Sequence, residues 1–537
     1  MKAFAALLDR LSYSPARNAK IRLIAGYLRA TPDPDRGWAL AALSDRLDLS
    51  FPWRRILGEL LAGKIDPELY RLSRDYVGDT AETVALLWPG RREEPQTGAA
   101  PELRITDIVG ALQSATRAAA PVLIAQWLDQ LDITGRWALL KLLTGALRVG
   151  ASARLAKTAL ATLGNVEPDD IEQIWHGLSP PYIELFAWLE GRGPKPEIGN
   201  YPAFRPMMLA HPIEDRELAE LDVAAFAAEW KWDGIRVQVV AAGGGLRLYT
   251  RTGDDISQTF PDVAGAFAAS LVTGIVLDGE LLIVRGGTVA AFNDLQQRLN
   301  RKAVTKAMLD RYPAHVRLYD LLMQGDEDLR PLAFDQRRAR LEAWHARAAP
   351  ASTSVSELLA IPNREELERI WGQTRGQGIE GLMLKRRASP YLAGRPKGHW
   401  YKMKRAALTI DCVLMYAQRG SGKRSSYYSD YTFGAWTTDD KGAPRVVPVG
   451  KAYSGFTDEE LLALDKWIRT HTVERFGPVL SVAPELVLEV AFDAVQRSPR
   501  HKSGVAMRFP RIHRIRWDKP AAEADRLETL VALIDGA

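Results

Sequence analysis

The chain has 537 residues, of which 71 are basic and 66 acidic, so its formal net charge is only +5. A hydrophobic content of 47% and a charged content of 26% are typical of folded globular proteins and exclude extensive disorder. The single cysteine, Cys412, excludes an internal disulfide and a cysteine-rich zinc site. No run approaches the roughly 18 to 20 apolar residues of a membrane helix, and the first residues lack the apolar core of a signal peptide. We therefore expect a cytoplasmic protein with no membrane partner.

The first part of the chain has the apolar spacing of helices. Leu7 and Leu11 lie one helical turn apart, and an Ala-rich periodic run follows at 105–130. Gly and Pro are then concentrated in the segment that precedes a change of pattern. We predict an all-helical domain over residues 1–195 and a linker over residues 196–206.

From residue 207 the pattern changes to short runs rich in β-branched and aromatic residues, such as IRVQVV at 235–240. A helical pattern at 334–349 interrupts these runs, so we predict an α+β domain over residues 207–404. More short strands with turn signals follow, among them LVLEVAFD at 486–493. Their spacing predicts a small β-barrel over residues 405–537.

The mild net charge conceals two strongly basic segments. Residues 385–405 contain eight Lys or Arg and no acid, whereas residues 497–519 contain eight Lys or Arg and one acid. Together they carry a charge of +15 and leave −10 for the rest of the chain, although residues 1–200 balance 24 basic with 24 acidic side chains. A solvated face is the ordinary explanation of a single charge run. Two runs with interleaved aromatic residues, such as Trp400 and Trp517, favour a polyanionic partner.

Short motifs that suit nucleotide chemistry follow one another from residue 229 to residue 519. The sharpest is EWKWDGIR, which begins at Glu229 and contains Lys231 and Arg236; its Lys-x-Asp-Gly core is common by chance when it stands alone. The later motifs are, in chain order, RTG at Arg251, LDGEL around Glu280, LYDL around Tyr319, EGLMLK from Glu380, WYKMK around Lys402 and Lys404, and RFPR from Arg508 to Arg511 with WDK behind it. Because the motifs occur together and in this order, they are stronger evidence for nucleotide chemistry than any one of them alone.

Physical chemistry can assign these residue types to one nucleotide. A lysine is a nucleophile only without its proton, and the nearby cations of Lys402 and Lys404 would favour that form of Lys231. Lysines and Mg²⁺ can neutralise an α-phosphate before a nucleophile approaches it. Glu380 suits Mg²⁺, with a salt-bridged surface glutamate as the alternative. Tyr319 suits base stacking, with a core aromatic residue as the alternative.

Taken in this order, the motifs resemble those of the ATP-dependent DNA ligases, a branch of the covalent nucleotidyltransferases. Upstream, KLLTGALRVG at 141–150 resembles a helical stretch of the DNA-binding domain of cellular and related bacterial DNA ligases. Downstream, RHKSGVAMRFPRIHRIRWDK at 500–519 resembles the final motif of their OB domain. The resemblance implies a multidomain protein, with an all-α DNA-binding domain over 1–195, an α+β nucleotidyltransferase (adenylation) domain over 207–404 and a β-barrel OB-fold domain over 405–537.

The resemblance also implies the reaction. Such an enzyme seals nicks between a 5′-phosphate and a 3′-hydroxyl in duplex DNA, through a covalent lysine–AMP intermediate and an adenylated DNA 5′ end. ATP would be the co-substrate and Mg²⁺ or Mn²⁺ the metal cofactor. The partner would be nicked duplex DNA, and the enzyme would act as a monomer in the cytoplasm, associated with the nucleoid.

The resemblance assigns the nucleotide site residue by residue. Lys231 would attack the α-phosphorus, with Lys402 and Lys404 holding the phosphate. Glu229 would accept a hydrogen bond from the adenine amino group. Glu280 would bind the ribose and the metal, Tyr319 would stack on the base, and Glu380 would bind the metal. Arg236 and Arg251 would contact the ribose or the 5′-phosphate of the nick. The motifs also contain Asp233, Asp278, Asp320 and Lys385, for which structural support is the alternative to a role in the site.

Two further groups of residues lie outside that core. The resemblance implies that Arg508 and Arg511, in the OB-fold domain, orient the pyrophosphate leaving group. In the helical domain, Arg148, Arg154 and Lys157 are candidates for contact with DNA phosphates, because their spacing of six and three residues can place them on one helix-end face. Ordinary solvated charges are an equal alternative for these three residues.

Other enzymes and one non-enzymatic function stay open as alternatives. A capping guanylyltransferase shares the Lys-x-Asp-Gly chemistry, but the helical first domain, Glu229 and the RFPR ending favour a DNA ligase. An RNA ligase is a second alternative, because the sequence does not exclude RNA joining. An NAD-dependent ligase is disfavoured, since that family's pattern uses a four-cysteine zinc module. A non-catalytic nucleic-acid-binding scaffold is disfavoured by the presence of Lys231, Glu380, Lys402 and Lys404.

Overall fold

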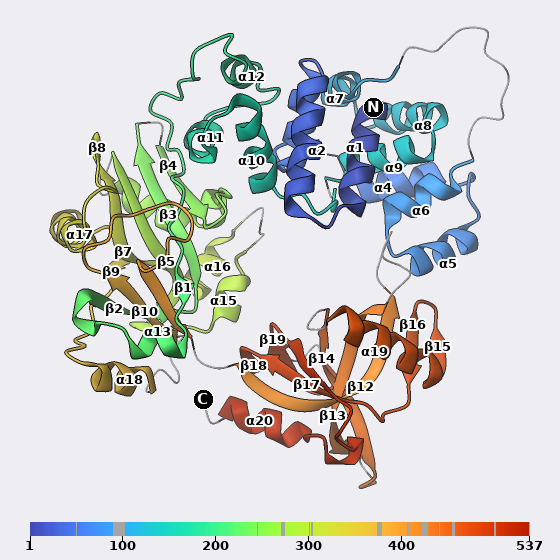
Figure 1. The fold of residues 1–537 in the computed structure, drawn as a ribbon. Coiled ribbons are helices and arrows are strands. Elements are labelled where there is room, and N and C mark those ends of the chain that lie inside the picture. Colours follow the sequence, from blue (N-terminus) through green and yellow to red (C-terminus); the bar gives the residue numbers. More distant parts are fainter. Residues whose placement is uncertain are drawn as a thin grey trace. The chain divides into compact units, whose positions relative to one another are not determined.

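The computed structural model is drawn in Figure 1. It describes residues 1–49, 51–89, 102–145, 147–243, 245–269, 274–299, 301, 304–372, 379–404, 407–419, 428–439, 441–453, 457–498 and 501–535. The chain divides into two compact units. One consists of Met1–Ala153 together with Ala406–Ala537, and the other of Arg154–Arg405.

The described part of residues 1–153 consists of helices and their connections, as predicted for residues 1–195. The helices are α1 (Lys2–Tyr13), α2 (Arg17–Ala30), α3 (Asp35–Leu43), α4 (Trp53–Leu61), α5 (Pro67–Val77), α6 (Thr80–Leu87), α7 (Ile105–Ser114), α8 (Ala119–Gln130) and α9 (Ile133–Thr144). Leu7 and Leu11 are buried on one side of α1, which confirms the helical spacing read from the sequence. Asp79 caps α6 by accepting from the Glu82 amide at 2.9 Å, and Lys141 of α9 donates to the same carboxylate at 2.5 Å.

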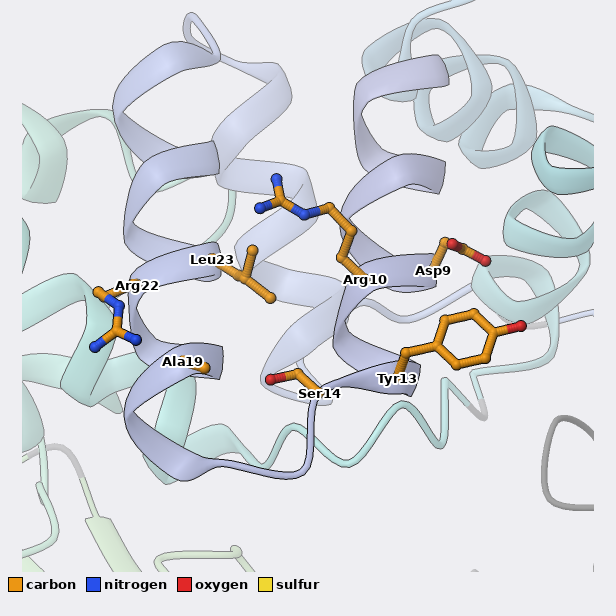
Figure 2. Close-up of a pocket in the computed structure, with 7 residues that line it drawn as sticks. All are labelled: Asp9, Arg10, Tyr13, Ser14, Ala19, Arg22 and Leu23. Atoms are coloured by element: carbon orange, nitrogen blue, oxygen red, sulfur yellow. The ribbon is translucent and has the colours of Figure 1, made fainter.

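Two grooves indent this helical region. The first, about 530 Å³ in volume, lies between α1 and α2 and is lined by both signs of charge, with Asp9 and Arg10 on α1 and Arg22 on α2 (Figure 2). The second, about 690 Å³, is lined by residues of α4, α5, α6 and α9 and by Arg148. None of the residues that the sequence assigns to the nucleotide lines either groove.

The second unit begins with three helices and continues into two sheets. Its helices are α10 (Ala153–Gly164), α11 (Pro168–Trp175), α12 (Ile183–Leu189), α13 (Asp215–Ala219), α14 (Pro261–Ala269), α15 (Phe292–Gln296), α16 (Lys306–Arg311), α17 (Phe334–Ala348) and α18 (Arg364–Gly372). Helices α10 to α12 fall within the predicted range 1–195, yet they belong to the same compact unit as the sheets. Phe204, in the predicted linker, is buried in this unit and packs edge-on against Tyr249.

The strands of this unit form the predicted α+β arrangement. They are β1 (His211–Pro212), β2 (Phe226–Trp232), β3 (Ile235–Ala242), β4 (Gly245–Thr250), β5 (Ile275–Arg285), β6 (Thr288–Val289), β7 (Ala314–Gln324), β8 (Glu327–Asp328), β9 (Thr353–Val355), β10 (Ile379–Arg386) and β11 (Trp400–Lys404). One sheet has the order β1-β11-β10-β2 and the other β4-β3-β5-β7-β8, with β6 beside β5 and β9 beside β7. Residues 233 and 234 carry the chain from β2 in the first sheet to β3 in the second.

Residues 406–537 are rich in strands, as predicted. The elements are β12 (Leu408–Arg419), β13 (Tyr428–Thr438), β14 (Pro444–Ala452), α19 (Asp458–Thr470), β15 (Thr472–Phe476), β16 (Val479–Val482), β17 (Val487–Phe492), β18 (Ala494–Arg497), β19 (Val505–Arg508), β20 (Arg511–Arg516) and α20 (Leu527–Asp535). The long strand β12 pairs with β13, β16 and β17. Its inward side chains, Cys412 among them, form one apolar core with Leu464 of α19 and Leu530 of α20. Cys412 is a buried, free thiol.

Within the described ranges, no helix combines the length and the apolar character that spanning a bilayer requires.

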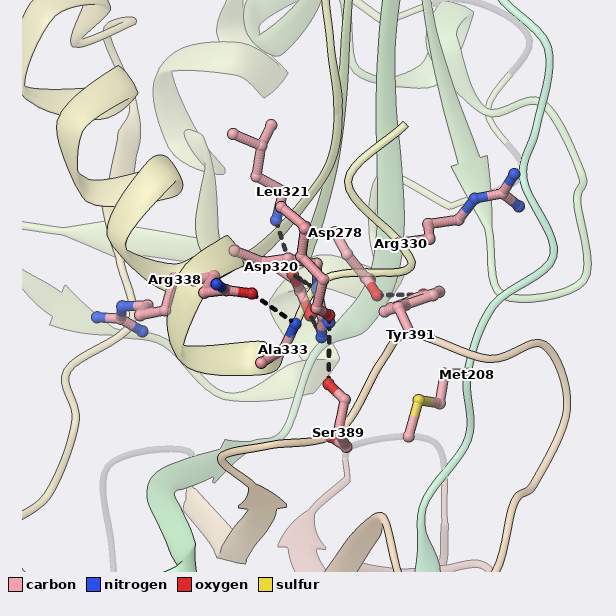
Figure 3. A network of polar contacts seen from close by, with 12 residues as sticks. Met208, Asp278, Asp320, Leu321, Arg330, Ala333, Arg338, Ser389 and Tyr391 are labelled. Carbon is pink, nitrogen blue, oxygen red and sulfur yellow. Dashed lines mark hydrogen bonds and ion pairs between the residues drawn. The ribbon is translucent and has the colours of Figure 1, made fainter. Parts of the chain in front are cut away.

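A buried ion pair connects strand β7 to helix α17. Arg337 donates from Nε to Asp320 Oδ1 at 2.8 Å and from Nη2 to Oδ2 at 2.9 Å, and both side chains are fully buried. The same guanidinium donates to the carbonyl of Ser389 at 3.1 Å (Figure 3). One arginine therefore connects β7, α17 and the segment between β10 and β11.

We predict that Arg337→Met lowers the free energy of unfolding by about 3–5 kcal/mol, because it removes the cation that pairs with the buried Asp320 carboxylate. The double variant Arg337→Met/Asp320→Leu should recover most of that loss, since neither charge remains. Urea unfolding monitored by tryptophan fluorescence measures both. A double variant less stable than Arg337→Met would contradict this explanation.

Candidate active site

The register of three strands gathers the lysines. Strand β10 lies between β2 and β11, and Gly381 is opposite Lys231 on one side and Lys404 on the other. Two residues further along β10, Met383 is opposite Glu229 and Lys402 in the same way. Because side chains alternate along a strand, each pair of residues two apart shares one face of the sheet. Pairing thus places residues from three distant motifs side by side.

Lys231 forms an ion pair with Glu380, the residue before Gly381, through Nζ and Oε2. Lys404 Nζ lies 3.2 Å from the same oxygen. Burial opposes ionisation of Glu380, but the Lys231 and Lys404 ammonium groups outweigh it and lower the pKa of Glu380 to about 2. Each partner of the Lys231–Glu380 pair is still 21% exposed, so the pair is reachable by a ligand.

Two glycines allow these strands to approach closely. A Cβ on Gly381, whose φ is +149°, would lie 2.0 Å from the Met403 carbonyl oxygen. A Cβ on Gly234 would lie 2.5 Å from the Leu281 carbonyl oxygen and 2.8 Å from Glu280 Cγ. The glycine of the Lys-x-Asp-Gly motif is therefore required by the contact between β5 and the turn after Lys231.

Glu280 brings a second carboxylate to this site from β5. Burial raises the pKa of Glu280 to about 8, while the nearby cations Lys231 and Arg236 act in the opposite direction. Arg236 is committed elsewhere, because it donates to both oxygens of the fully buried Asp278 at 3.0 and 2.6 Å. Tyr391 donates to Asp278 as well, at 2.7 Å (Figure 3). Glu280 therefore has less cationic compensation than its neighbours.

Glu280 and Glu380 fit a magnesium ion by their chemistry. Both carboxylates interact with Lys231, and the raised pKa of Glu280 indicates a buried acid that a cation would stabilise. Mg²⁺ binds through one or two carboxylates when phosphate oxygens and water supply the other ligands. Among the described residues, no group of three or more His, Cys, Asp or Glu side chains could hold a metal ion by itself.

Lys402 lies in a cluster of positive charge. Burial lowers the pKa of Lys402, and four neighbouring cations lower it further: Arg395, Lys404, Lys231 and Arg251. Arg251 is exposed in the turn after β4. Such a concentration of like charge is costly unless an anion binds there. The cluster suits a polyphosphate or a nucleic-acid phosphate.

Glu229 is more deeply buried than the other predicted residues, with 2% of its side chain exposed. Lys385 Nζ lies 3.2 Å from both of its oxygens, and Arg338 Nη1 lies 3.4 Å from Oε1. Burial nevertheless raises the pKa of Glu229. Lys385 Nζ also lies 4.2 Å from the centre of the Tyr319 ring, so the two predicted base-contacting residues share one buried lysine.

The sequence interpretation missed part of this network. It left Lys385 without a role, and it did not single out Arg337 or Arg338. All three are buried, and a run of arginines on a predicted helix ordinarily indicates a solvated face. Their position in the sequence could have indicated a role, because Arg337 and Arg338 lie near the start of the helix that follows the LYDL motif.

The remaining predicted residues belong to other elements or have other partners. Arg508 and Arg511 end β19 and begin β20, and Arg511 pairs with Asp493 at 3.3 Å. Arg148 is exposed, with a positive φ of 48°, and Arg154 is exposed on α10. Lys157 was predicted to share an exposed face with these arginines, and this was wrong. It is only 3% exposed and forms a buried ion pair with Glu172 of α11.

Comparisons with known proteins identify the family of the chain. The model "ATP dependent DNA ligase domain" matches residues 207–404, and "ATP dependent DNA ligase C terminal region" matches residues 424–519. The chain is 30% identical to a "Probable DNA ligase" of Koribacter versatilis, over 98% of this chain and 95% of that protein. It is 29% identical to "DNA ligase 1" of Korarchaeum cryptofilum, over 98% and 97% of the two chains.

A solved structure, "Pmar-Lig_PreS3", is similar in fold, with a TM-score of 0.57 and 16% identity over 96% of this chain and 99% of that one. Both family models cover residues that contribute to the predicted chemistry, and the match to the bacterial protein extends over nearly the full length of both chains. The chain therefore belongs to the ATP-dependent DNA ligase family.

Proposed function

We propose that this protein seals nicks between a 5′-phosphate and a 3′-hydroxyl in duplex DNA, using ATP to form a covalent AMP adduct on Lys231. The observation that supports this most directly is the placement of Lys231 beside Glu380, within a cluster of cations that includes Lys402 and Lys404. A capping enzyme, an RNA ligase or a scaffold is not favoured, because both matched family models are those of ATP-dependent DNA ligases.

In the first step, Lys231 Nζ attacks the α-phosphorus of ATP. The new N–P bond forms as the bond to the bridging oxygen of pyrophosphate breaks. Lys402 and Lys404 reduce the repulsion between the triphosphate and the incoming nucleophile and align the phosphate. Glu380, paired with the Lys231 ammonium, orients Nζ; the ammonium gives up a proton to solvent before the attack, because only the neutral amine has a free electron pair.

Glu280 and Glu380 would hold Mg²⁺. Bound there, the ion would neutralise phosphate charge. It would also weaken the ion pair between Glu380 and the Lys231 ammonium, which favours loss of the ammonium proton. Glu229 would accept from the adenine amino group and Tyr319 would pack against the base, both supported from behind by Lys385. Arg236, fixed by Asp278, would contact the ribose.

The later steps use the same cations. AMP passes from Lys231 to the 5′-phosphate of the nick, where Arg251 would contact that phosphate from its exposed turn. The 3′-hydroxyl then displaces AMP and closes the strand. Both are in-line displacements at phosphorus, so alignment and charge neutralisation supply most of the catalysis.

The assignment of the other regions is also part of this proposal. Residues 1–195 would form the DNA-binding domain, where Arg148 and Arg154 remain candidates for phosphate contact, and residues 405–537 would form the OB-fold domain. There, Arg508 and Arg511 would orient the pyrophosphate. Their neighbour Phe509 is 61% exposed, which suits a nucleic-acid surface. The working form would be a monomer on nicked DNA in the cytoplasm, associated with the nucleoid.

Labelled ATP tests the first step. We predict that the protein, incubated with Mg²⁺, retains label from the α-phosphate and not from the γ-phosphate on a denaturing gel. Lys231→Ala should lose the label completely, because the amine that forms the N–P bond is then missing. The exposed Lys306→Ala serves as the matched control and should label like the wild type. Label from GTP in place of ATP would indicate a capping enzyme, and no label at all would indicate a scaffold.

The role of Glu380 has its own test. We predict that Glu380→Gln slows lysine–AMP formation by about 100-fold, because it removes the charge that orients Lys231 and one carboxylate for the metal. It should also raise the Mg²⁺ concentration needed for half-maximal rate. Initial labelling rates over a series of MgCl₂ concentrations measure both, with the exposed Glu327→Gln as the control. An unchanged rate and metal dependence would remove Glu380 from the site.

A further inference from the structure

The turn that carries Arg251 is tightly built. Thr250 and Asp254 exchange backbone and side-chain hydrogen bonds: the Thr250 amide donates to the Asp254 carbonyl at 2.9 Å, and Thr250 Oγ1 donates to Asp254 Oδ2 at 3.1 Å. The Gly253 amide donates to the Thr250 carbonyl at 2.9 Å. These bonds fix the shape of the turn. Its position relative to the rest of the site depends on what lies against it.

His176, at the end of helix α11, lies against this turn. Its Nε2 is 2.7 Å from the Gly253 carbonyl oxygen, and since a carbonyl only accepts, His176 carries a proton on Nε2. The imidazole also packs on Tyr249, at 4.6 Å between ring centres, and on Phe204 at 5.8 Å. The side chain is 6% exposed, so this contact is a buried one.

Gly253 fits this contact closely. Its φ is +86°, and a Cβ at this position would lie 3.4 Å from both His176 Cε1 and Phe204 Cδ1. The backbone of the turn thus reaches the imidazole in a conformation that glycine adopts without strain. His176 is 77 residues away in sequence, and it comes from a helix that lies in the range predicted for the DNA-binding domain.

A second contact from the same helices supports the turn. Lys157 of α10 is buried in an ion pair with Glu172 of α11, and its ammonium also attracts Asp254 of the turn. Burial lowers the pKa of Lys157, and Glu172 and Asp254 oppose that shift. Helices α10 and α11 are thereby tied to each other, and they interact with the turn at Gly253 and Asp254.

On the basis of the function proposed above, we propose that His176 is a positioning residue: it holds the 250–254 turn so that Arg251 meets the 5′-phosphate of the nick. Arg251 would act after lysine–AMP has formed, and His176 contacts Gly253, Tyr249 and Phe204, none of which the proposed function assigns to the nucleotide. The effect of His176 therefore falls on AMP transfer to DNA and leaves adenylation of Lys231 intact.

The experiment separates the two steps. Lysine–AMP formation is measured with labelled ATP and no DNA, and transfer is measured in a single turnover by mixing purified adenylated protein with nicked duplex DNA. We expect His176→Ala to leave the first rate unchanged and to slow transfer about tenfold or more, as a small misplacement of a contact to a reacting group does. His176→Gln, which retains an N–H donor near the position of Nε2, should recover most of the transfer rate.

Two further variants make the result specific. His176→Phe keeps the aromatic packing without the hydrogen bond and should slow transfer like His176→Ala, even if the alanine variant folds poorly. Arg251→Ala should slow transfer at least as much, and the double variant His176→Ala/Arg251→Ala should be no slower than Arg251→Ala. Lys195→Ala, which breaks a surface ion pair with Asp170 of α11, is the matched control and should behave as the wild type.

Several outcomes would overturn this role of His176. They are equal slowing of both steps by His176→Phe, normal transfer by that variant, additive losses in the double variant, or normal transfer by Arg251→Ala. Each of these can occur while the wild type forms lysine–AMP normally, and then the proposed function stands. Absence of lysine–AMP in the wild type would overturn both.

Discussion

Gly381 stands between two lysines, and the site depends on that register. Its amide backbone pairs with Lys231 on β2 and Lys404 on β11, and the side chain before it, Glu380, faces both ammonium groups. Shifting either strand by one residue would turn the lysine to the opposite face of the sheet. A side chain at Gly381 would collide with the Met403 carbonyl, so glycine is a condition of this pairing.

Charge balance explains why the site needs ligands. Lys402 is crowded by other cations, and burial leaves Glu280 with a pKa of about 8. Anionic phosphates would reduce the repulsion among the cations around Lys402, and a divalent cation would stabilise the ionised form of Glu280. Behind them, the networks centred on Asp278, Asp320 and Glu229 are internally paired. The reactive face is therefore left with unbalanced charge, while the groups that support it are neutralised by one another.

Much of the fold could be predicted from the sequence, because helix and strand periodicity are local properties of the chain. The helical and α+β regions follow from such patterns, whereas the clustering of Lys231, Glu380, Lys402 and Lys404 is implied by the resemblance of the ordered motifs to those of DNA ligases. Burial of long charged side chains does not follow from local patterns, since a lysine's fate depends on residues far away in the chain. The sequence therefore predicted an exposed Lys157, although this lysine is buried in an ion pair with Glu172. The contact between His176 and Gly253 has no signature in the sequence of either segment.

The central claim is that Lys231 is the residue that carries AMP. Intact-protein mass spectrometry after incubation with ATP and Mg²⁺, followed by peptide mapping, tests it most directly. The predicted result is a gain of one adenylyl group, located on the peptide that contains Lys231 and released when nicked DNA is added. An adduct on Lys402 or Lys404, or no gain in mass, would contradict it.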